Sequence, residues 1–263
     1  MSSREENQIH IKSTADFEKM EAVGRITEET LLLVGEHVKA GVSTAELDRI
    51  AYDHILACGA RPACLGYCGY PATLCTSVNR QVVHGIPGKY RLKDGDIISC
   101  DLVVEKDGFH GDACRTFLVG NVPEDVRELV RVTRECFYKG LEQCVAGKRI
   151  GDIASAVQSH AESHGYGVVR DLVGHGIGRH MHEAPDVPNF WDTKRFGHGA
   201  RLEVGMAICV EPMIAMGGWE VVQLDDGWTI ETADGSPAAH YENTILITAE
   251  GPVLTTLHGE ETI

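Results

Sequence analysis

The sequence predicts a mixed α/β (α+β) domain made of two related halves, at about residues 13–121 and 122–250. Three observations support this prediction. Each half offers two helical patterns followed by short apolar runs typical of strands. A glycine-led strand at 95–101 is echoed at 205–211, with an acidic residue six positions after the glycine in both. Several acidic residues also stand within or beside strand-like runs, where a carboxylate must be paired, neutralised or bound to a cation.

The first half is predicted to open with two helices. Ser13 or Thr14 can cap a helix that runs to about residue 40. Ser43-Thr44-Ala45-Glu46 has the form of a capping box and begins a second helix that reaches about residue 58.

Short strands and turns follow, and the second half repeats this order. In the first half, strands are expected at about 74–78, 81–84, 96–104 and 111–118. Lys106-Asp107-Gly108 forms a hairpin turn between the last two of these strands. In the second half, helices are expected at about 123–146 and 152–164, and strands near 172 and at about 206–211, 220–224, 228–231 and 242–248.

Composition restricts the class of protein. Hydrophobic residues make up 43% of the 263 residues, which is ordinary for a globular chain. The net charge of −15 argues against broad nucleic-acid binding, which needs a basic surface. No apolar run approaches the roughly 18 residues of a membrane helix, and the polar start lacks the core of a secretory signal. Nine dispersed cysteines fit a reducing compartment. We therefore expect a cytoplasmic monomer with a flexible tail at 1–12 and no membrane or direct nucleic-acid partner.

Five residues from distant segments have the chemistry of a metal site. Asp101 and Asp112 lie on the two arms of the predicted hairpin, where side chains alternate between faces and both can point to one spot. Glu211 and Glu242 stand beside strands of the second half, and His175 adds a nitrogen from a glycine-flanked turn. One nitrogen and four carboxylates suit a cluster of divalent metals, and such a cluster predicts metal-dependent hydrolysis.

The histidine-rich segment at 173–183 fits neither of two common motifs. Arg179 occupies the place of the third glycine in a dinucleotide fingerprint, and the His-Glu-x-x-His pattern of a zinc protease is missing. The segment is therefore predicted to be a flexible turn. His180 is expected to face solvent, and His110 and His198 are expected to be surface residues.

Further motifs share their order and spacing with one enzyme family over about residues 14–250. They are His84-Gly85-Ile86-Pro87, Asp101, Gly111-Asp112, Gly174-His175-Gly176-Ile177-Gly178, His182-Glu183, Val210-Glu211-Pro212 and Tyr241-Glu242-Asn243-Thr244. On these motifs the chain resembles the type I methionine aminopeptidases. The resemblance implies a pita-bread fold, whose two pseudo-symmetric halves have antiparallel sheets covered by helices, in a single catalytic domain at 13–263. It also implies removal of the N-terminal methionine, at the ribosome, from nascent proteins and peptides whose second residue is small.

The resemblance further implies a role for each matched residue. Asp101 corresponds to a bidentate ligand of one divalent ion, and Asp112 and Glu242 correspond to bridging ligands. His175 and Glu211 correspond to ligands of a second ion. Either ion could be Co, Mn, Fe, Ni or Zn on this donor set. The implied catalytic residues are His84, His182 and Glu211.

A methionine pocket and a monovalent cation site are implied as well. The implied pocket residues are Cys64, Tyr67, Tyr70, His84, Met181, His182 and Trp228. Met181 departs from the family pattern, where an aromatic residue is usual, and Cys68 stands where a histidine is expected. Both departures are expected to reshape the pocket and to keep its preference for an apolar thioether. Asn79 and Gln81 match a backbone-bound monovalent cation site.

The sequence alone leaves alternatives open. Prolidase and aminopeptidase P share the five ligands but generally carry a large N-terminal domain, and only about thirteen residues precede the first predicted helix here. Type II methionine aminopeptidases insert a helical segment between the second histidine and the first glutamate, and only twenty-nine positions separate His182 from Glu211. A metal-free binding protein of the same fold, or a metal-buffering protein, would show no peptidase turnover.

Overall fold

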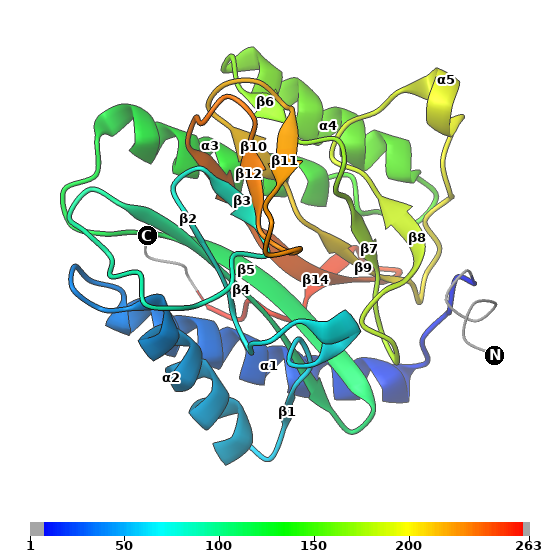
Figure 1. Ribbon diagram of the computed structural model, residues 1–263. Coiled ribbons are helices and arrows are strands. Elements are labelled where there is room, and N and C mark those ends of the chain that lie inside the picture. The colour runs from blue at the N-terminus through cyan, green and yellow to red at the C-terminus, as the bar shows by residue number, and fades with distance from the viewer. Residues whose placement is uncertain (1–7, 260–263) are drawn as a thin grey trace.

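The computed structural model describes residues 8–259 as alternating groups of helices and strands (Figure 1). Its helices are α1 (Thr14–His37), α2 (Thr44–Ala57), α3 (Glu124–Leu141), α4 (Ile150–Ser163) and the short α5 (Thr193–Phe196), with a 3-10 turn η2 at Tyr67–Gly69. The strands of the first half are β1 (Arg61–Pro62), β2 (Cys75–Val78), β3 (Gln81–Val83), β4 (Ile97–Lys106) and β5 (Phe109–Leu118). Those of the second half are β6 (Gly167–Val168), β7 (Gly174–Gly176), β8 (Glu183–Val187), β9 (Ala207–Val210), β10 (Met213–Ala215), β11 (Val221–Gln223), β12 (Ile230–Thr232), β13 (Ala238–His240), β14 (Glu242–Ile247) and β15 (Pro252–Leu254). The predicted mixed α/β class is confirmed.

Serine caps begin the first two helices, as predicted. The Ser13 side chain accepts from the backbone N–H of Asp16, and the Asp16 carboxylate accepts from Ser13 N–H at 3.0 Å. Ser43 and Glu46 form the same reciprocal pair at the start of α2, where the carboxylate lies 2.8 Å from Ser43 N. Each capping box satisfies N–H groups that the first turn of a helix leaves unpaired.

A nine-stranded antiparallel sheet runs through both halves. Its order is β1-β4-β5-β14-β9-β7-β8, with β2 paired to β4 and β15 paired to β14. β5 and β14 join the halves, with Cys114 opposite Glu242. Helices α1 and α2 pack along strands of the first half, and α3 and α4 along strands of the second (Figure 1). Two three-stranded sheets, β13-β10-β6 and β11-β12-β3, complete the fold.

The first core cluster lies between α1 and the β4–β5 hairpin. Met20, Leu31 and Val34 of α1 are fully or almost fully buried in it, and Phe17 and Ile26 pack against it while partly buried. The helical spacing of these residues predicts this contact face.

Gly95 and Gly205 stand before equivalent strand pairs in the two halves, β4 with β5 and β9 with β14. Both have a positive φ, +95° and +97°, which glycine adopts without the strain that a side chain would cause. Gly95 N–H donates to Val119 O at 2.8 Å, and Val119 N–H donates back to the carbonyl of the residue after the glycine at 2.9 Å. Gly205 and Ile247 make the same two bonds, both at 2.9 Å. The repeated sequence pattern therefore corresponds to a repeated structural unit.

Two sequence-based expectations about local conformation are wrong. α3 ends at Leu141 and not near residue 146, because the N–H groups of Gln143 and Cys144 bond to carbonyls three residues earlier and form tight turns. The strand expected near residue 172 lies at β7, so His175 is held in a strand and not in a flexible turn.

The predicted tail at 1–12 also extends too far. Residues 1–7 lie outside the described residues, but Ile9 forms a bridge with Ala184 and Lys12 is buried. Lys12 Nζ lies 2.7 Å from Glu183 Oε2, with both side chains almost fully buried. These contacts fix the segment before α1 to β8.

Candidate metal centre

Five neighbouring strands of the large sheet each bring one predicted ligand to the same cavity. Asp101 lies in β4, Asp112 in β5, Glu242 in β14 and His175 in β7, and Glu211 directly follows β9. These strands are consecutive in the order β4-β5-β14-β9-β7. All five side chains line a cavity of about 230 Å³.

The strand register explains why the carboxylates share a face. Asp101 pairs with Cys114 across the hairpin, and Asp112 pairs with Val103. Because alternate residues of a strand share a face, the two aspartates face the same way in a diagonal arrangement and are not directly opposite. The hydroxyl of Thr244 in β14 accepts from Asp112 N–H and donates to Asp112 O, both at 3.0 Å, which fixes β5 against β14 at this point.

His175 is oriented as a metal-binding histidine. Its Nδ1 lies 2.9 Å from the Gly176 carbonyl, so a proton on Nδ1 leaves the Nε2 lone pair facing the carboxylates. Nε2 lies 3.6 Å from Asp112 Oδ2 and 3.7 Å from Glu211 Oε1. A Cβ on Gly174 would lie 2.4 Å from Cys209 O, so the glycine is needed for β7 to approach β9 this closely.

The electrostatics of the cavity favour a bound cation. Burial, together with repulsion from the neighbouring carboxylates, raises the pKa values of Asp101, Glu211 and Glu242 well above their usual range. Asp112 Oδ1 and Glu242 Oε1 are buried and have no hydrogen-bond partner among the described residues. Unpartnered carboxylate oxygens beside an imidazole lone pair are the donor set that divalent first-row metals bind, so these residues fit such ions.

Two further predicted residues, His84 and His182, border the same cavity. His84 has a φ of +58°, which is uncommon for a non-glycine residue and typical of functional positions. Burial lowers its pKa, partly offset by the charge of Asp112. His182 is exposed on one side, but desolvation of its ring by the cavity wall, and repulsion from nearby histidines, lowers its pKa to about 3, so the ring is neutral near pH 7. The Tyr67 hydroxyl lies 2.7 Å from His182 Nδ1 and controls which ring nitrogen carries the proton.

The predicted pocket residues form an apolar wall of the cavity. Cys64, Tyr70 and Met181 belong to one buried cluster, and Trp228 packs against it while partly exposed. The Tyr70 and Trp228 rings meet edge to face with centroids 5.1 Å apart. Cys68 is exposed in η2 and is absent from the lining of this cavity.

Sequence reasoning missed two residues of this cluster. His240 Nε2 lies 3.8 Å from Glu211 Oε2, and Cys209 lies with Asp112, His175 and Glu242 in a group whose donor atoms are within 4.8 Å of one another. His240 precedes Glu242 by two residues, and Cys209 precedes Glu211 by two. The spacing alone does not place these side chains beside the ligands, because β13 ends at His240 and β14 begins at Glu242, and Glu211 lies beyond the end of β9.

The other histidine expectations have mixed outcomes. His180 and His198 are exposed, as expected. His110 is buried, not a surface residue, because its Nδ1 lies 3.1 Å from Gly178 O beneath the segment that carries His182.

Of the two residues predicted to bind a monovalent cation, Asn79 lies in the turn before β3 and Gln81 begins β3. Asn79 has a φ of +55°, its carbonyl accepts from Ala238 N–H at 2.9 Å, and its amide donates to Asp96 at 2.9 Å. The Gln81 side-chain oxygen accepts from Val78 N–H at 2.9 Å. These bonds fix the turn between β2 and β3.

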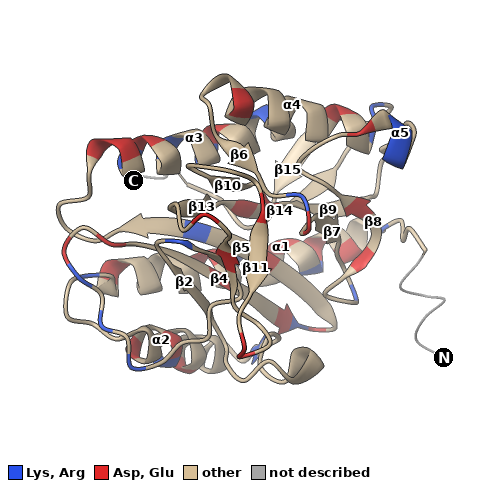
Figure 2. Cartoon of the chain, turned by 45° about the horizontal axis from the view of Figure 1, so that its top comes forward, with Lys and Arg blue, Asp and Glu red and all other residues tan. Residues whose placement is uncertain are grey.

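Acidic residues are spread over the outer helices. Figure 2 shows Asp and Glu on α2, α3 and α4, with Lys and Arg among them and two basic residues on α5. Among the described residues, no helix is both long and apolar enough to cross a membrane.

Comparison with known proteins identifies the class. The model of metallopeptidase family M24 matches residues 18–249, and the chain belongs to that family. Within it, the methionine aminopeptidase of Clostridium perfringens is 50% identical over 249 residues, covering 95% of this chain and 99% of that protein. The crystal structure of methionine aminopeptidase from Rickettsia prowazekii superposes with a TM-score of 0.92 at 42% identity, covering 95% of this chain and 100% of that one. The pita-bread fold and the resemblance to methionine aminopeptidases are confirmed.

A prolidase shares the fold alone. The prolidase from Pyrococcus furiosus superposes with a TM-score of 0.74 at 21% identity, over 95% of this chain and 66% of that chain. Its unmatched third agrees with the additional domain that prolidases were expected to carry.

Proposed function

We propose that the chain is a type I methionine aminopeptidase, with 13–263 as one catalytic domain. It removes the N-terminal methionine from nascent proteins and peptides whose second residue is small. The observation that carries the proposal is the single cavity in which five potential metal ligands face an apolar wall. The membership in family M24 and the near full-length relatives support it.

Two divalent ions would be held by the five residues. Asp101 would be a ligand of one ion, His175 and Glu211 ligands of the other, and Asp112 and Glu242 ligands of both. Ions bound there would lower the pKa of a water molecule and polarise a carbonyl oxygen, which is the chemistry that amide hydrolysis requires. The donor set accepts Co, Mn, Fe, Ni or Zn.

Side chains of the protein accept and donate the protons that the reaction transfers. Glu211 accepts the proton of the attacking water, because its carboxylate lines the same cavity as the other ligands. When the Tyr67 hydroxyl donates to His182 Nδ1, the proton of His182 resides on Nε2, which can donate to the oxyanion of the tetrahedral intermediate. His84 donates to the departing amine nitrogen.

The apolar wall selects the methionine side chain. The edge-to-face pair of Tyr70 and Trp228 offers ring edges and faces that sulfur contacts favourably. Met181 and Cys64 add polarisable sulfur atoms to the same wall. A second residue with a bulky side chain would collide with the pocket mouth.

The proposal includes a second cation site and a cellular setting. Asn79 and Gln81 hold a monovalent cation near β3. The protein acts as a cytoplasmic monomer on N-termini that emerge from the ribosome.

Peptide assays test the proposal. Purified protein with added Mn or Co should release methionine from Met-Ala-Ser but not from Met-Leu peptides, and a chelator should abolish release. An Asp112→Asn variant should be inactive while it remains folded by circular dichroism. Hydrolysis of Xaa-Pro dipeptides in place of Met-Ala-Ser, or no turnover with any added metal, would overturn the proposal.

A further inference from the structure

His240 is a buried histidine beside the metal centre that none of the roles above uses. It ends β13, two residues before Glu242, and only 1% of its surface is exposed. Neither Nδ1 nor Nε2 has a hydrogen-bond partner among the described residues. A buried polar group without a partner is destabilising, so a ligand for this imidazole is expected.

The His240 ring lies at about the same distance from the carboxylates as the His175 ring does. His240 Nε2 lies 3.8 Å from Glu211 Oε2 and 4.0 Å from Glu242 Oε2. His175 Nε2 lies 3.6 Å from Asp112 Oδ2 and 3.7 Å from Glu211 Oε1. Glu211 therefore presents one oxygen to each imidazole.

These distances suit atoms around a shared ion better than atoms in a hydrogen bond. Hydrogen bonds from nitrogen to oxygen have lengths of about 2.7–3.2 Å, and the His240 distances exceed that range. Ligand bonds to zinc are about 2.0–2.2 Å long, so two donors on one ion lie roughly 3–4 Å apart, depending on the angle between them. Donor atoms of Glu211, His240 and Glu242 all lie within 4.8 Å of one another.

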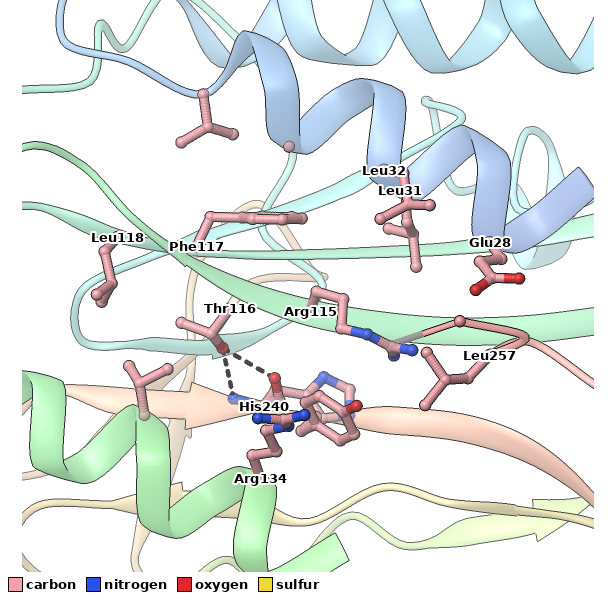
Figure 3. Close-up of a pocket in the computed structure, with 15 residues that line it drawn as sticks. Glu28, Leu31, Leu32, Arg115, Thr116, Phe117, Leu118, Arg134, His240 and Leu257 are labelled. Atoms are coloured by element: carbon pink, nitrogen blue, oxygen red, sulfur yellow. Dashed lines mark hydrogen bonds between the residues drawn. The ribbon is translucent and has the colours of Figure 1, made fainter. Parts of the chain in front are cut away.

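The backbone holds His240 in this position. Its N–H donates to Thr116 Oγ1 at 3.0 Å, and the Thr116 hydroxyl donates to the His240 carbonyl at 2.8 Å (Figure 3). β13 also pairs with β10, with Met213 opposite His240. The residue borders both the metal cavity and a second cavity of about 280 Å³ between α1, β5 and α3 (Figure 3). It thus stands in the wall between the two cavities, where its backbone is fixed before any ion binds.

We propose that His240 is an additional metal ligand, whose Nε2 binds the cation that Glu211 and Glu242 share. The inference rests on the proposed metal centre and extends its donor set from one imidazole to two. A second nitrogen donor favours borderline ions such as Zn, Ni or Co over Mn, because imidazole suits the former better than carboxylate and water ligands do.

Nitrogen-15 NMR of the cadmium-loaded protein tests the assignment directly. The full chain is labelled with nitrogen-15 in the histidine rings and loaded with cadmium-113, whose one-bond coupling to nitrogen reports a metal–imidazole bond. Two coupled imidazoles are expected in the parent and one in His240→Gln. His175→Gln should keep the His240 coupling and lose its own. His110→Gln, which removes another buried histidine, should keep both.

Metal affinity provides a second readout. In calorimetric titrations, His240→Gln should weaken Zn binding by at least about 10-fold, with a smaller change for Mn. A parent that binds cadmium through a single imidazole overturns the inference and leaves the metal centre intact. A parent that binds no cadmium overturns both. The parent spectrum gives the number of coupled rings, and loss of one coupling in His240→Gln, with both kept in His110→Gln, assigns the second ring to His240; two couplings that both persist in a folded His240→Gln also overturn the inference.

Discussion

Replacing Glu183 by glutamine tests the ion pair that ties the segment before α1 to β8. Lys12 Nζ and Glu183 Oε2 are 2.7 Å apart, and the side chains are only 5% and 1% exposed. Glu183→Gln leaves the Lys12 ammonium buried without a counter-charge, and breaking a buried pair in this way costs about 3–5 kcal/mol of unfolding free energy. Urea unfolding followed by tryptophan fluorescence measures the change.

An exposed pair in the same chain is the matched control. Arg49 Nε and Asp53 Oδ2 are at a similar distance, 2.8 Å, but their side chains are 75% and 57% exposed. Asp53→Asn makes the same kind of charge change and should cost only about 0.3–0.5 kcal/mol. Adding Lys12→Met to Glu183→Gln should recover part of the loss, because no buried charge remains. Equal costs for Glu183→Gln and Asp53→Asn would refute the argument from burial.

The same pair predicts a dependence on pH. Burial raises the pKa of Glu183, but the hydrogen bond and charge of Lys12, together with the hydrogen bond from His180 N–H, hold that pKa below its usual value. The unfolded chain then binds the proton more readily than the folded chain does. The contribution to stability is therefore complete above the unfolded pKa, about 4.3, and is lost as the pH falls through the lower folded value. The parent should lose its advantage over Glu183→Gln on acidification below about pH 4, and a constant difference down to pH 2 would contradict this.

Three further predictions concern the site. Tyr67→Phe removes the hydroxyl that contacts His182 Nδ1. In steady-state assays on Met-Ala-Ser it should lower kcat by up to about 10-fold with little change in KM. A change confined to KM would show that Tyr67 does not control the tautomer of His182. Trp228→Ala should raise KM roughly 10-fold, because an aromatic contact worth about 1.5 kcal/mol is lost, whereas an unchanged KM would exclude Trp228 from the pocket. Metal removal by a chelator should lower the unfolding free energy by about 2.7 kcal/mol, compared with protein in a metal concentration of roughly 100 times Kd. Urea unfolding curves that coincide with and without metal would show that no metal binds the folded chain.

The parts of the fold that local chemistry determines could be predicted from the sequence. The capping boxes at Ser13 and Ser43 place the first two helices, because their hydrogen bonds lie within four consecutive residues. The turn at Asp107 and Gly108 joins β4 and β5, because both adopt the positive φ that this turn needs. The five acidic and histidine residues were conspicuous because few charges are tolerated in apolar strands.

The parts that depend on distant partners could not be predicted. β7 has only three residues, two of them glycine, and it exists because Gly176 pairs with Ile208 of β9. His110 was expected at the surface because nothing in its neighbours along the chain indicates that Gly178 covers it. His240 was missed for a similar reason, since the chain bends between β13 and β14 and its closeness to Glu211 depends on the pairing of β14 with β9.

The order of the ligands along the chain has a consequence for biosynthesis. The cavity takes donors from both halves, and the last of them, Glu242, lies in β14, the strand that joins β5 to β9. An incomplete chain that stops before β14 lacks this donor as well as the strand that aligns the other four. If these five residues form the metal centre as proposed, no activity is expected until nearly all of the sequence shown here has been translated, and prematurely terminated copies should be inert instead of partially active.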